Sequence, residues 1–435
     1  MKKRIPVFLC VLLLTLLTGC GAKTIDEMYS LPRHSERNNN LRSAIESAMT
    51  GRVYAAPVSG ANQESVQTAD LDGDGKEEYL VFAKVVQDDS LQILLFHQPG
   101  DENFELWETI SCKGSSFEQV HYADIDGKPG CELVVGTQLN EKVTRTVSLY
   151  SFASAQAEKI KSMIYLKLVV CDLDGNGSSD LMVIQNGEAE YGNGVARLYS
   201  YVDGNVVGSA EAKLSVSPEH IRRIAVNKLS SGEPAVYVAS ASNQNAVITD
   251  IFALRGGVFT NISQSKDVGI SMQTLRNYFV YAEDLNNDGV LELPSLLPMM
   301  YNTTEQNLIR WFTIDIQGRE TNMLYTFHNF EDGWYIELDS EWIDRFAAEK
   351  NGNVYTFYMW NNNYGAAVPV FTIHAFNGKD RDMQASEQNR FPLYSGQDVV
   401  FAGKMESGSA IYGMTESYLR ENFHLIRQDW KTSES

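Results

Sequence analysis

The chain has 435 residues, enough for two or three domains with buried cores, and a formal net charge of −20 at neutral pH. The excess of 56 acidic over 36 basic residues argues against nucleic acid and anionic lipid as partners, and it is compatible with divalent cations. Aromatic residues make up 11% of the chain and glycine occurs 32 times, which together favour β-structure.

The N-terminus has the order of an export signal. Basic residues 2–4 precede an apolar run over residues 5–17, which is shorter than the roughly 20 residues that span a bilayer. The sequence Leu-Thr-Gly-Cys that ends at Cys20 resembles the lipobox of bacterial lipoproteins. This resemblance implies that residues 1–19 are a signal peptide and that Cys20 carries a lipid at the mature N-terminus. An ordinary signal peptide cut elsewhere, with Cys20 incidental, is the alternative.

A lipid on Cys20 would hold the chain at the extracytoplasmic face of the cell membrane. Such a cysteine carries at least two acyl chains, and two chains anchor a protein stably where one does not. No later segment is long and apolar enough to span a membrane, so we expect a tethered, soluble remainder. Residues 20–50 are polar at first and then place Leu41, Ile45 and Met49 at helical spacing. We predict a tether followed by one short amphipathic helix.

An acidic turn recurs along the middle of the chain. Its four copies begin at Asp70, Asp124, Asp172 and Asp284, with separations of 54, 48 and 112 residues. The last separation is close to two periods and predicts a further copy near its middle. Asn227 begins such a copy, Asn-Lys-Leu-Ser-Ser-Gly, which keeps the turn but has lost the carboxylates.

Each copy lies between two β-like stretches, and further short strands follow it. A unit of about 55 residues with four strands and one acidic turn is typical of a propeller blade. The turns also resemble those of FG-GAP or VCBS-type repeats, the family that includes the integrin α-subunit head propeller. The resemblance implies a β-propeller over residues 51–328, with five recognisable blades where family members commonly have seven. Only the DxDxDG part of the family motif is present, without the Phe-Gly and Gly-Ala-Pro elements.

From residue 329 onward the acidic turns stop. We predict a helix that begins with Ser340 as its N-cap and a late helix capped by Thr415. Three strands between them are predicted over residues 354–360, 368–376 and 399–404. Residues 329–435 would then form a small α+β domain, with two degenerate blades as the alternative. The expected fold class is mainly β: a β-propeller of about five recognisable blades followed by this small domain.

The spacing of oxygen-bearing residues in the turns predicts calcium sites. Positions 1, 3 and 5 place side-chain oxygens on one side of a tight loop, position 7 offers a backbone carbonyl, and position 9 adds a carboxylate. Together they give Ca²⁺ the roughly 6–8 hard oxygen ligands that it prefers. The predicted ligands in the three complete turns are Asp70, Asp72, Asp74, Lys76 and Glu78; Asp172, Asp174, Asn176, Ser178 and Asp180; and Asp284, Asn286, Asp288, Val290 and Glu292.

The second turn departs from this pattern because Lys128 occupies position 5. We expect weak or no calcium binding by Asp124, Asp126 and Glu132, which would pair with Lys128 instead. The fourth turn has no acidic set, and we expect no ion there.

Two other interpretations of the turns compete with calcium-binding blades. An EF-hand loop ends in an acidic residue at position 12 and is flanked by helices. Position 12 here is Val81, Val135, Val183 or Ser295, and the flanking residues are β-branched and apolar. A strand-capping turn without any ion is the remaining alternative. We expect calcium in at least one turn, in a structural rather than a catalytic role.

The cysteines and one aromatic run give weaker predictions. Cys112, Cys131 and Cys171 show no zinc or disulfide spacing, so buried free thiols are favoured over a bridge between Cys112 and Cys131. The aromatic run over residues 355–364 favours a strand with one core face over a sugar-binding surface.

No motif for catalysis stands out. HExxH, GxSxG and P-loop sequences are absent, and the seven histidines are scattered singly. We therefore predict a non-enzymatic lipoprotein whose propeller binds a protein or glycan, although neither that ligand nor the oligomeric state follows from the sequence. A carbohydrate-active or other hydrolytic surface enzyme is one alternative, and it predicts a pocket with converging carboxylates outside the turns. A solute-binding lipoprotein of a transporter is another, and it predicts two βαβ lobes.

Overall fold

The computed structural model describes residues 36–99, 103–139, 144–152, 156–187, 193–243, 246–277, 280–299, 307–360 and 367–426. The predicted signal peptide, Cys20 and most of the tether lie outside these ranges. Within them, none of the helices has the length and apolar character needed to cross a membrane. The described chain is mainly β, with six antiparallel sheets and few helices. The two βαβ lobes of a solute-binding protein are not found in these ranges, since every sheet is antiparallel.

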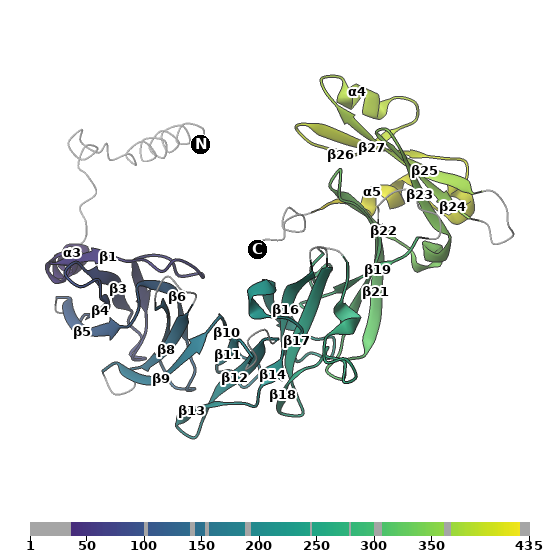
Figure 1. Cartoon of the computed structure of the whole chain (residues 1–435). Coiled ribbons are helices and arrows are strands. Elements are labelled where there is room, and N and C mark those ends of the chain that lie inside the picture. Colours follow the sequence, from purple (N-terminus) through teal and green to yellow (C-terminus); the bar gives the residue numbers. More distant parts are fainter. Residues whose placement is uncertain are drawn as a thin grey trace, which may run out of the picture. The chain divides into compact units, whose positions relative to one another are not determined.

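The chain divides into two compact units. The first holds helix α3 (Glu36–Ala48) and a five-stranded sheet (Figure 1). Ile45 of α3 is buried against Val81 and Leu94 of this sheet, which confirms the predicted amphipathic helix. The sheet has the order β1-β3-β4-β5, with β2 also paired to β3. Its strands are β1 (Arg52–Tyr54), β2 (Val66–Ala69), β3 (Glu78–Val85), β4 (Leu91–His97) and β5 (Glu105–Cys112).

The second unit begins with three sheets whose strands are neighbours in the order of the chain. In each of them an acidic turn, or its degenerate copy, links the first strand to the second. The second sheet is β6 (Ser116–Ala123), β7 (Glu132–Gln138), β8 (Arg145–Ser151) and β9 (Glu158–Tyr165). The third is β10 (Lys167–Cys171), β11 (Asp180–Gln185), β12 (Val195–Val202) and β13 (Asn205–Gly208), with β14 (Ala212–Lys213) paired to β12. The fourth is β15 (Ile221–Lys228), β16 (Pro234–Asn243), β17 (Ala246–Arg255) and β18 (Val258–Asn261).

The fifth sheet departs from the predicted unit. Its order is β19-β20-β21-β22-β28, with strands β19 (Leu293–Leu297), β20 (Asn307–Ile314), β21 (Glu320–Asn329), β22 (Trp334–Leu338) and β28 (Phe423–Leu425). A strand was expected before its acidic turn, over residues 278–283. In the described part of that segment only Glu283 pairs, through an isolated bridge to Glu292. The predicted boundary at residue 329 is also crossed, because β22 and β28 follow it and complete this sheet.

The sixth sheet has the order β23-β24-β25-β27-β26. Its elements are β23 (Phe346–Asn351), β24 (Val354–Met359), β25 (Val368–Asn377), α4 (Arg381–Ser386), β26 (Phe391–Ser395), β27 (Val399–Met405) and α5 (Glu416–Glu421). The N-cap prediction at Thr415 is confirmed, since its side chain accepts a hydrogen bond from the Tyr418 N–H at 3.1 Å. The cap prediction at Ser340 is wrong: a 3-10 helix, Ser340–Arg345, begins after Asp339, and no side chain caps it.

Consecutive sheets of the second unit pack face to face through alternating residues of their inner strands. In β11, Leu181 and Val183 pack with residues of the second sheet, while Met182 and Ile184 pack with residues of the fourth. This division follows from the two-residue period of a strand, which points successive side chains to opposite faces. The same alternation in β16 sends Val236 and Val238 towards the third sheet and Ala235 and Tyr237 towards the fifth. Inner strands are therefore buried on both faces.

Candidate metal centres

The acidic turns share one backbone geometry. The carboxylate at position 1 folds back over the loop and accepts backbone N–H groups from positions 4 to 6. Asp70 accepts from Gly73 at 2.8 Å and from Gly75 at 3.1 Å, and both glycines have positive φ angles of 76° and 84°. Asp172 makes the equivalent bonds to the N–H groups of residues 175 and 177 at 2.7 and 2.9 Å. These glycines are required because a side chain is strained in the left-handed region.

The fifth turn keeps the geometry without a glycine at position 4. Asp284 accepts from the Asp288 N–H at 3.0 Å and from the Gly289 N–H at 2.9 Å. Position 4 is Asn287, with a φ of 58°. Asparagine tolerates the left-handed conformation better than most residues, so the turn closes in the same way.

The carboxylate at position 9 is the first buried group of each following strand. Glu78, Glu132, Asp180 and Glu292 are between 1% and 5% exposed. In the last three turns this carboxylate accepts the backbone N–H of position 2: Ile125 to Glu132 at 2.9 Å, Leu173 to Asp180 at 3.0 Å, and Leu285 to Glu292 at 2.9 Å. The turn is thus fixed at both ends by its own carboxylates.

Burial raises the pKa of this position-9 carboxyl group. For Glu132, Asp180 and Glu292 loss of hydration is the largest cause, and backbone hydrogen bonds oppose it only in part. Carboxylates at position 3 or 5 of the same turn raise the pKa further by like-charge repulsion. A bound divalent cation would reverse both effects.

Three of the predicted ligand sets converge. In each, one oxygen from every carboxylate lies within 4.8 Å of the others, close enough to share one ion. The sets are Asp70, Asp72 and Glu78; Asp124, Asp126 and Glu132; and Asp172, Asp174 and Asp180. The position-5 residues Asn176 and Asp288 are exposed at the outer side of their turns. Each bonds to the position-3 side chain: the Asn176 amide donates to Asp174 at 2.9 Å, and the Asn286 amide donates to Asp288 at 2.9 Å.

The fifth turn carries a buried carboxylate oxygen that lacks a partner. Glu292 is 1% exposed, its Oε2 accepts the Leu285 N–H, and its Oε1 makes no hydrogen bond to any described residue. Like-charge repulsion from Asp288 and Asp284 adds to the effect of burial in raising the pKa of this group, although these three carboxylates are not among the sets that converge within 4.8 Å. An unpaired buried carboxylate oxygen is costly. A cation coordinated by Asp284, Asp288 and Glu292 would remove that cost.

The second turn holds a cation of its own. Lys128 Nζ lies 2.6 Å from Asp126 Oδ2, and the Asp126 side chain is only 6% exposed. The same ammonium group lies 5.6 Å from the centroid of the Tyr201 ring. The predicted pairing with Lys128 is confirmed for Asp126, whereas Glu132 accepts the N–H groups of Ile125 and Asp126 instead.

The degenerate fourth turn is closed without an acidic cluster. The Ser231 hydroxyl donates to Glu233, and the Ser230 N–H donates to the Ile314 carbonyl at 3.0 Å. A buried polar network around Asp250, on β17, was not predicted from the sequence. This fully buried carboxylate accepts from the Ser215 and Ser271 hydroxyls, both at 2.6 Å, and from the Asn261 amide at 2.8 Å. Its donors come from positions 11 to 35 residues away, so no local spacing could reveal it.

Neighbouring acidic turns contact each other through equivalent positions. The Cys131 thiol at position 8 of the second turn donates to the Asp70 carbonyl at 3.2 Å, and the Ser179 N–H at position 8 of the third donates to the Asp124 carbonyl at 2.6 Å. A Cβ added to Gly73 would lie 2.5 Å from a backbone atom of Pro129. The turns therefore stack too closely for a side chain at Gly73.

The cysteines are free thiols, as favoured from the sequence, and no bridge joins Cys112 to Cys131. Burial raises the pKa of the Cys171 thiol to about 12, with Asp180 and Asp172 adding to the shift. This thiol is therefore a packed group rather than a reactive one.

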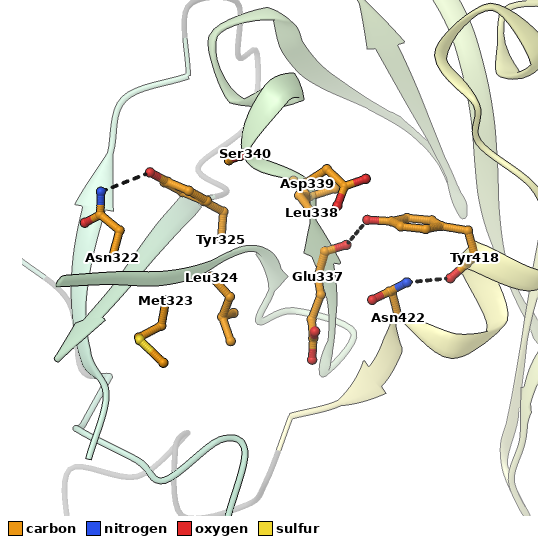
Figure 2. A pocket seen from close by; sticks show the side chains of 10 residues that line it. All are labelled: Asn322, Met323, Leu324, Tyr325, Glu337, Leu338, Asp339, Ser340, Tyr418 and Asn422. Carbon is orange, nitrogen blue, oxygen red and sulfur yellow. Dashed lines mark hydrogen bonds between the residues drawn. The ribbon is translucent and has the colours of Figure 1, made fainter. Parts of the chain in front are cut away.

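A polar pocket of about 520 Å³ lies outside the acidic turns, between β21, β22 and α5 (Figure 2). Its polar lining includes Asn322, Tyr325, Glu337, Asp339, Tyr418 and Asn422. The Tyr418 hydroxyl donates to the Glu337 carbonyl at 3.1 Å, and the Glu337 carboxylate lies 3.1 Å from His424 Nε2. Burial and the nearby Asp339 raise the pKa of Tyr418, which keeps its hydroxyl protonated. The sequence prediction missed this pocket because its residues come from three separate segments.

In the described part of the aromatic run, residues 355–360, alternate side chains of β24 face the core, as the favoured interpretation predicted. Tyr355 and Phe357 are buried in the core shared by the fifth and sixth sheets, and the Phe357 ring stacks on Phe371 at 4.5 Å. Residues 361–364 lie outside the described ranges.

The chain matches no protein-family model and no curated protein. Two solved structures are similar to it at low level. A crystal structure of the exotype rhamnogalacturonan lyase YesX has 10% identity and a TM-score of 0.30, with 75% of this chain and 67% of that chain covered. Rhamnogalacturonan lyase YesW has 12% identity and a TM-score of 0.32, with 72% of this chain and 64% of that chain covered. Scores of this size do not establish a common architecture, and no property of the lyases is carried over.

The second turn offers a direct test of the ligand pattern. We expect Lys128→Asp to remove the internal cation and to complete the oxygen set with Asp124, Asp126 and Glu132. The variant should bind one calcium ion more than the parent chain, measured by elemental analysis after equilibration at millimolar calcium. Lys213→Asp, an equal charge change on exposed β14, should leave the calcium content unchanged. Equal calcium content in the parent chain and Lys128→Asp would contradict the pattern.

Proposed function

We propose that this chain is a lipid-anchored, extracytoplasmic binding protein whose β-sheet repeats are stabilised by calcium. The observation that carries the proposal is the convergence of one buried carboxylate with two others in the first and third turns, where no lysine occupies position 5. The partly unpaired Glu292 supports a cation in the fifth turn. A hard, oxygen-only ligand set of this type fits Ca²⁺ better than a transition metal.

The repeated sheets would be blades of a β-propeller of the FG-GAP or VCBS type. Support comes from the serial packing of the second to fifth sheets and from the stacking of their acidic turns. Propeller loops commonly present a binding surface, so the ligand would be a protein or a glycan. Calcium would then act as a structural cofactor that fixes the loops, and nucleic acid is disfavoured by the net charge of −20.

The anchor is proposed from the sequence around Cys20, which lies outside the described residues. A lipid there would be followed by a polar tether and then by α3, which packs on the first sheet. The described part would thus be held close to the outer face of the membrane.

Calcium should stabilise the folded chain. Since an ion that binds only the native state stabilises it by RT ln(1 + [Ca²⁺]/Kd), calcium at 100 times Kd adds about 2.7 kcal/mol per site. We expect the melting temperature to rise with calcium and to fall after EDTA, as followed by differential scanning calorimetry. Magnesium should have a smaller effect, because it demands a tighter octahedral geometry.

The double variant Asp70→Ala/Asp284→Ala should lose most of this calcium-dependent shift. An equally charged control, Glu219→Ala/Asp267→Ala, removes two exposed carboxylates outside the turns and should keep the shift. A melting temperature insensitive to EDTA, with no ion co-purifying, would contradict the calcium proposal.

The anchor has its own test. We expect Cys20→Ala to move the protein from the membrane fraction to the soluble extracytoplasmic fraction, because the lipid can no longer be attached. Ser47→Ala, a substitution on α3, should leave the protein in the membrane fraction. Membrane retention of Cys20→Ala would rule out anchoring through this residue.

A carbohydrate-active or other hydrolytic enzyme remains a second candidate. It is favoured by one observation, the pocket outside the acidic turns whose lining includes Glu337 and Asp339 (Figure 2). Paired carboxylates can serve as general acid and base. If this candidate holds, a screen of polysaccharides will show turnover, and Glu337→Gln will slow it by about 100-fold or more. No turnover of any polysaccharide by the parent chain would eliminate it.

A further inference from the structure

The pocket between β21, β22 and α5 has the size of a small-ligand site. Its volume of about 520 Å³ lies within the range of roughly 300–1,000 Å³ that is usual for small-molecule pockets. Two consecutive strands and one distant helix contribute to it: β21, the end of β22 with Asp339 and Ser340, and the end of α5 with Asn422.

One wall is a strand edge that no described strand covers. β22 pairs with β21 only from Tyr325 to Asn329, and the first half of β21, residues 320–324, pairs on its other side with β20. Backbone N–H and C=O groups on the open side are therefore available to a ligand. Asn322 and Met323, which lie in this half, are exposed side chains of the pocket.

The charges of the lining exclude one class of ligand. Glu337 and Asp339 are carboxylates, and none of the lining residues is a lysine or an arginine. His424 lies against Glu337, at the edge of the pocket, and offsets part of that charge when it is protonated. Arg310 donates to Asn322 at 3.1 Å, but its charge is paired with Glu320 at 2.9 Å. An anionic ligand would therefore be repelled by the Asp339 carboxylate, so the pocket disfavours phosphates and uronates.

The remaining groups suit a ligand with many hydroxyls. Asn322 and Asn422 offer amides, Ser340 and Tyr325 offer hydroxyls, and Asp339 offers an exposed acceptor. The Tyr325 hydroxyl has a single long contact, 3.5 Å from the Asn322 amide, so it can exchange this contact for a ligand. Met323, which is exposed, and Leu324, which is half-buried, add an apolar surface that the C–H face of a sugar ring can cover.

We propose that this pocket binds an uncharged oligosaccharide of two or three sugar units. The proposal deepens the glycan branch of the proposed function and rests on it only for the class of partner, since the pocket contains none of the calcium ligands. A peptide strand added to the edge of β21 is disfavoured, because Asp339 and Ser340 follow β22 directly and line the pocket where an added strand would continue.

The test is titration of the full chain, purified in mild detergent, with neutral di- and trisaccharides of glucose, galactose and mannose by isothermal calorimetry. We expect at least one of them to bind. Tyr325→Phe removes only the hydroxyl, and Asp339→Asn removes only the charge and one acceptor. Each should weaken binding by about three- to tenfold. The matched controls Tyr394→Phe and Asp382→Asn lie outside the pocket and should leave affinity unchanged.

Three results would overturn the proposal. They are no binding of any neutral saccharide at millimolar concentration, an affinity of both pocket variants equal to that of the parent chain, or binding of a galacturonate trimer that is tighter than that of any neutral saccharide. Binding of a five-residue β-strand peptide without any saccharide would favour strand addition instead. Running each titration with calcium and with EDTA separates this proposal from the calcium proposal. If the chain binds a saccharide and its melting temperature does not respond to EDTA, only the calcium proposal is contradicted.

Discussion

A carboxylate that is buried at the start of a strand imposes the strongest constraint on this molecule. In the second, third and fifth turns the position-9 side chain accepts a backbone N–H from the start of its own loop and so holds the loop closed, as the Asp180 bond to the Leu173 N–H at 3.0 Å illustrates. The same burial raises the pKa of this group and brings it within reach of two further carboxylates. Charges of one sign in a poorly hydrated place need compensation. Lys128 provides it in the second turn, and calcium is the compensation that we propose in the others.

This local requirement is linked to the packing of the sheets. In the second and third sheets an acidic turn connects the first two strands, and the inner strands of the third and fourth sheets divide their side chains between the sheet before and the sheet after. Fixing the turn therefore fixes the register of the strand that begins with the buried carboxylate, and a one-residue slip would exchange its two apolar faces. Contacts between neighbouring turns, such as that of the Ser179 N–H with the Asp124 carbonyl, join this constraint from the second sheet to the third.

The parts of the structure that follow from local sequence were the parts that could be predicted. The period of the acidic turns predicted a series of antiparallel sheets, and the spacing within the first and third turns predicted which carboxylates converge. The second set also converges although a lysine replaces its position-5 ligand, and the fifth set is not among those that converge. The helix at Ile45 and the cap at Thr415 were equally local. What escaped prediction depends on distant pairing. β28 joins the fifth sheet from nearly 90 residues beyond β22, the Asp250 network draws donors from separate loops, and the Glu337 pocket needs three segments. Ser340 is not the N-cap because the 3-10 helix already includes it as its first residue. Asp339 takes the cap position, and its side chain makes no capping hydrogen bond.

The molecule combines a scaffold whose acidic turns need a compensating cation with a separate polar pocket that contains none of the proposed calcium ligands. The most direct measurement of the central claim is the number of calcium ions that the chain retains. Native mass spectrometry after removal of metal and re-equilibration with calcium counts them without reference to stability. The account predicts three ions, one each for the turns that begin at Asp70, Asp172 and Asp284, and none in the turn that contains Lys128. A chain that remains folded and retains no calcium would contradict it.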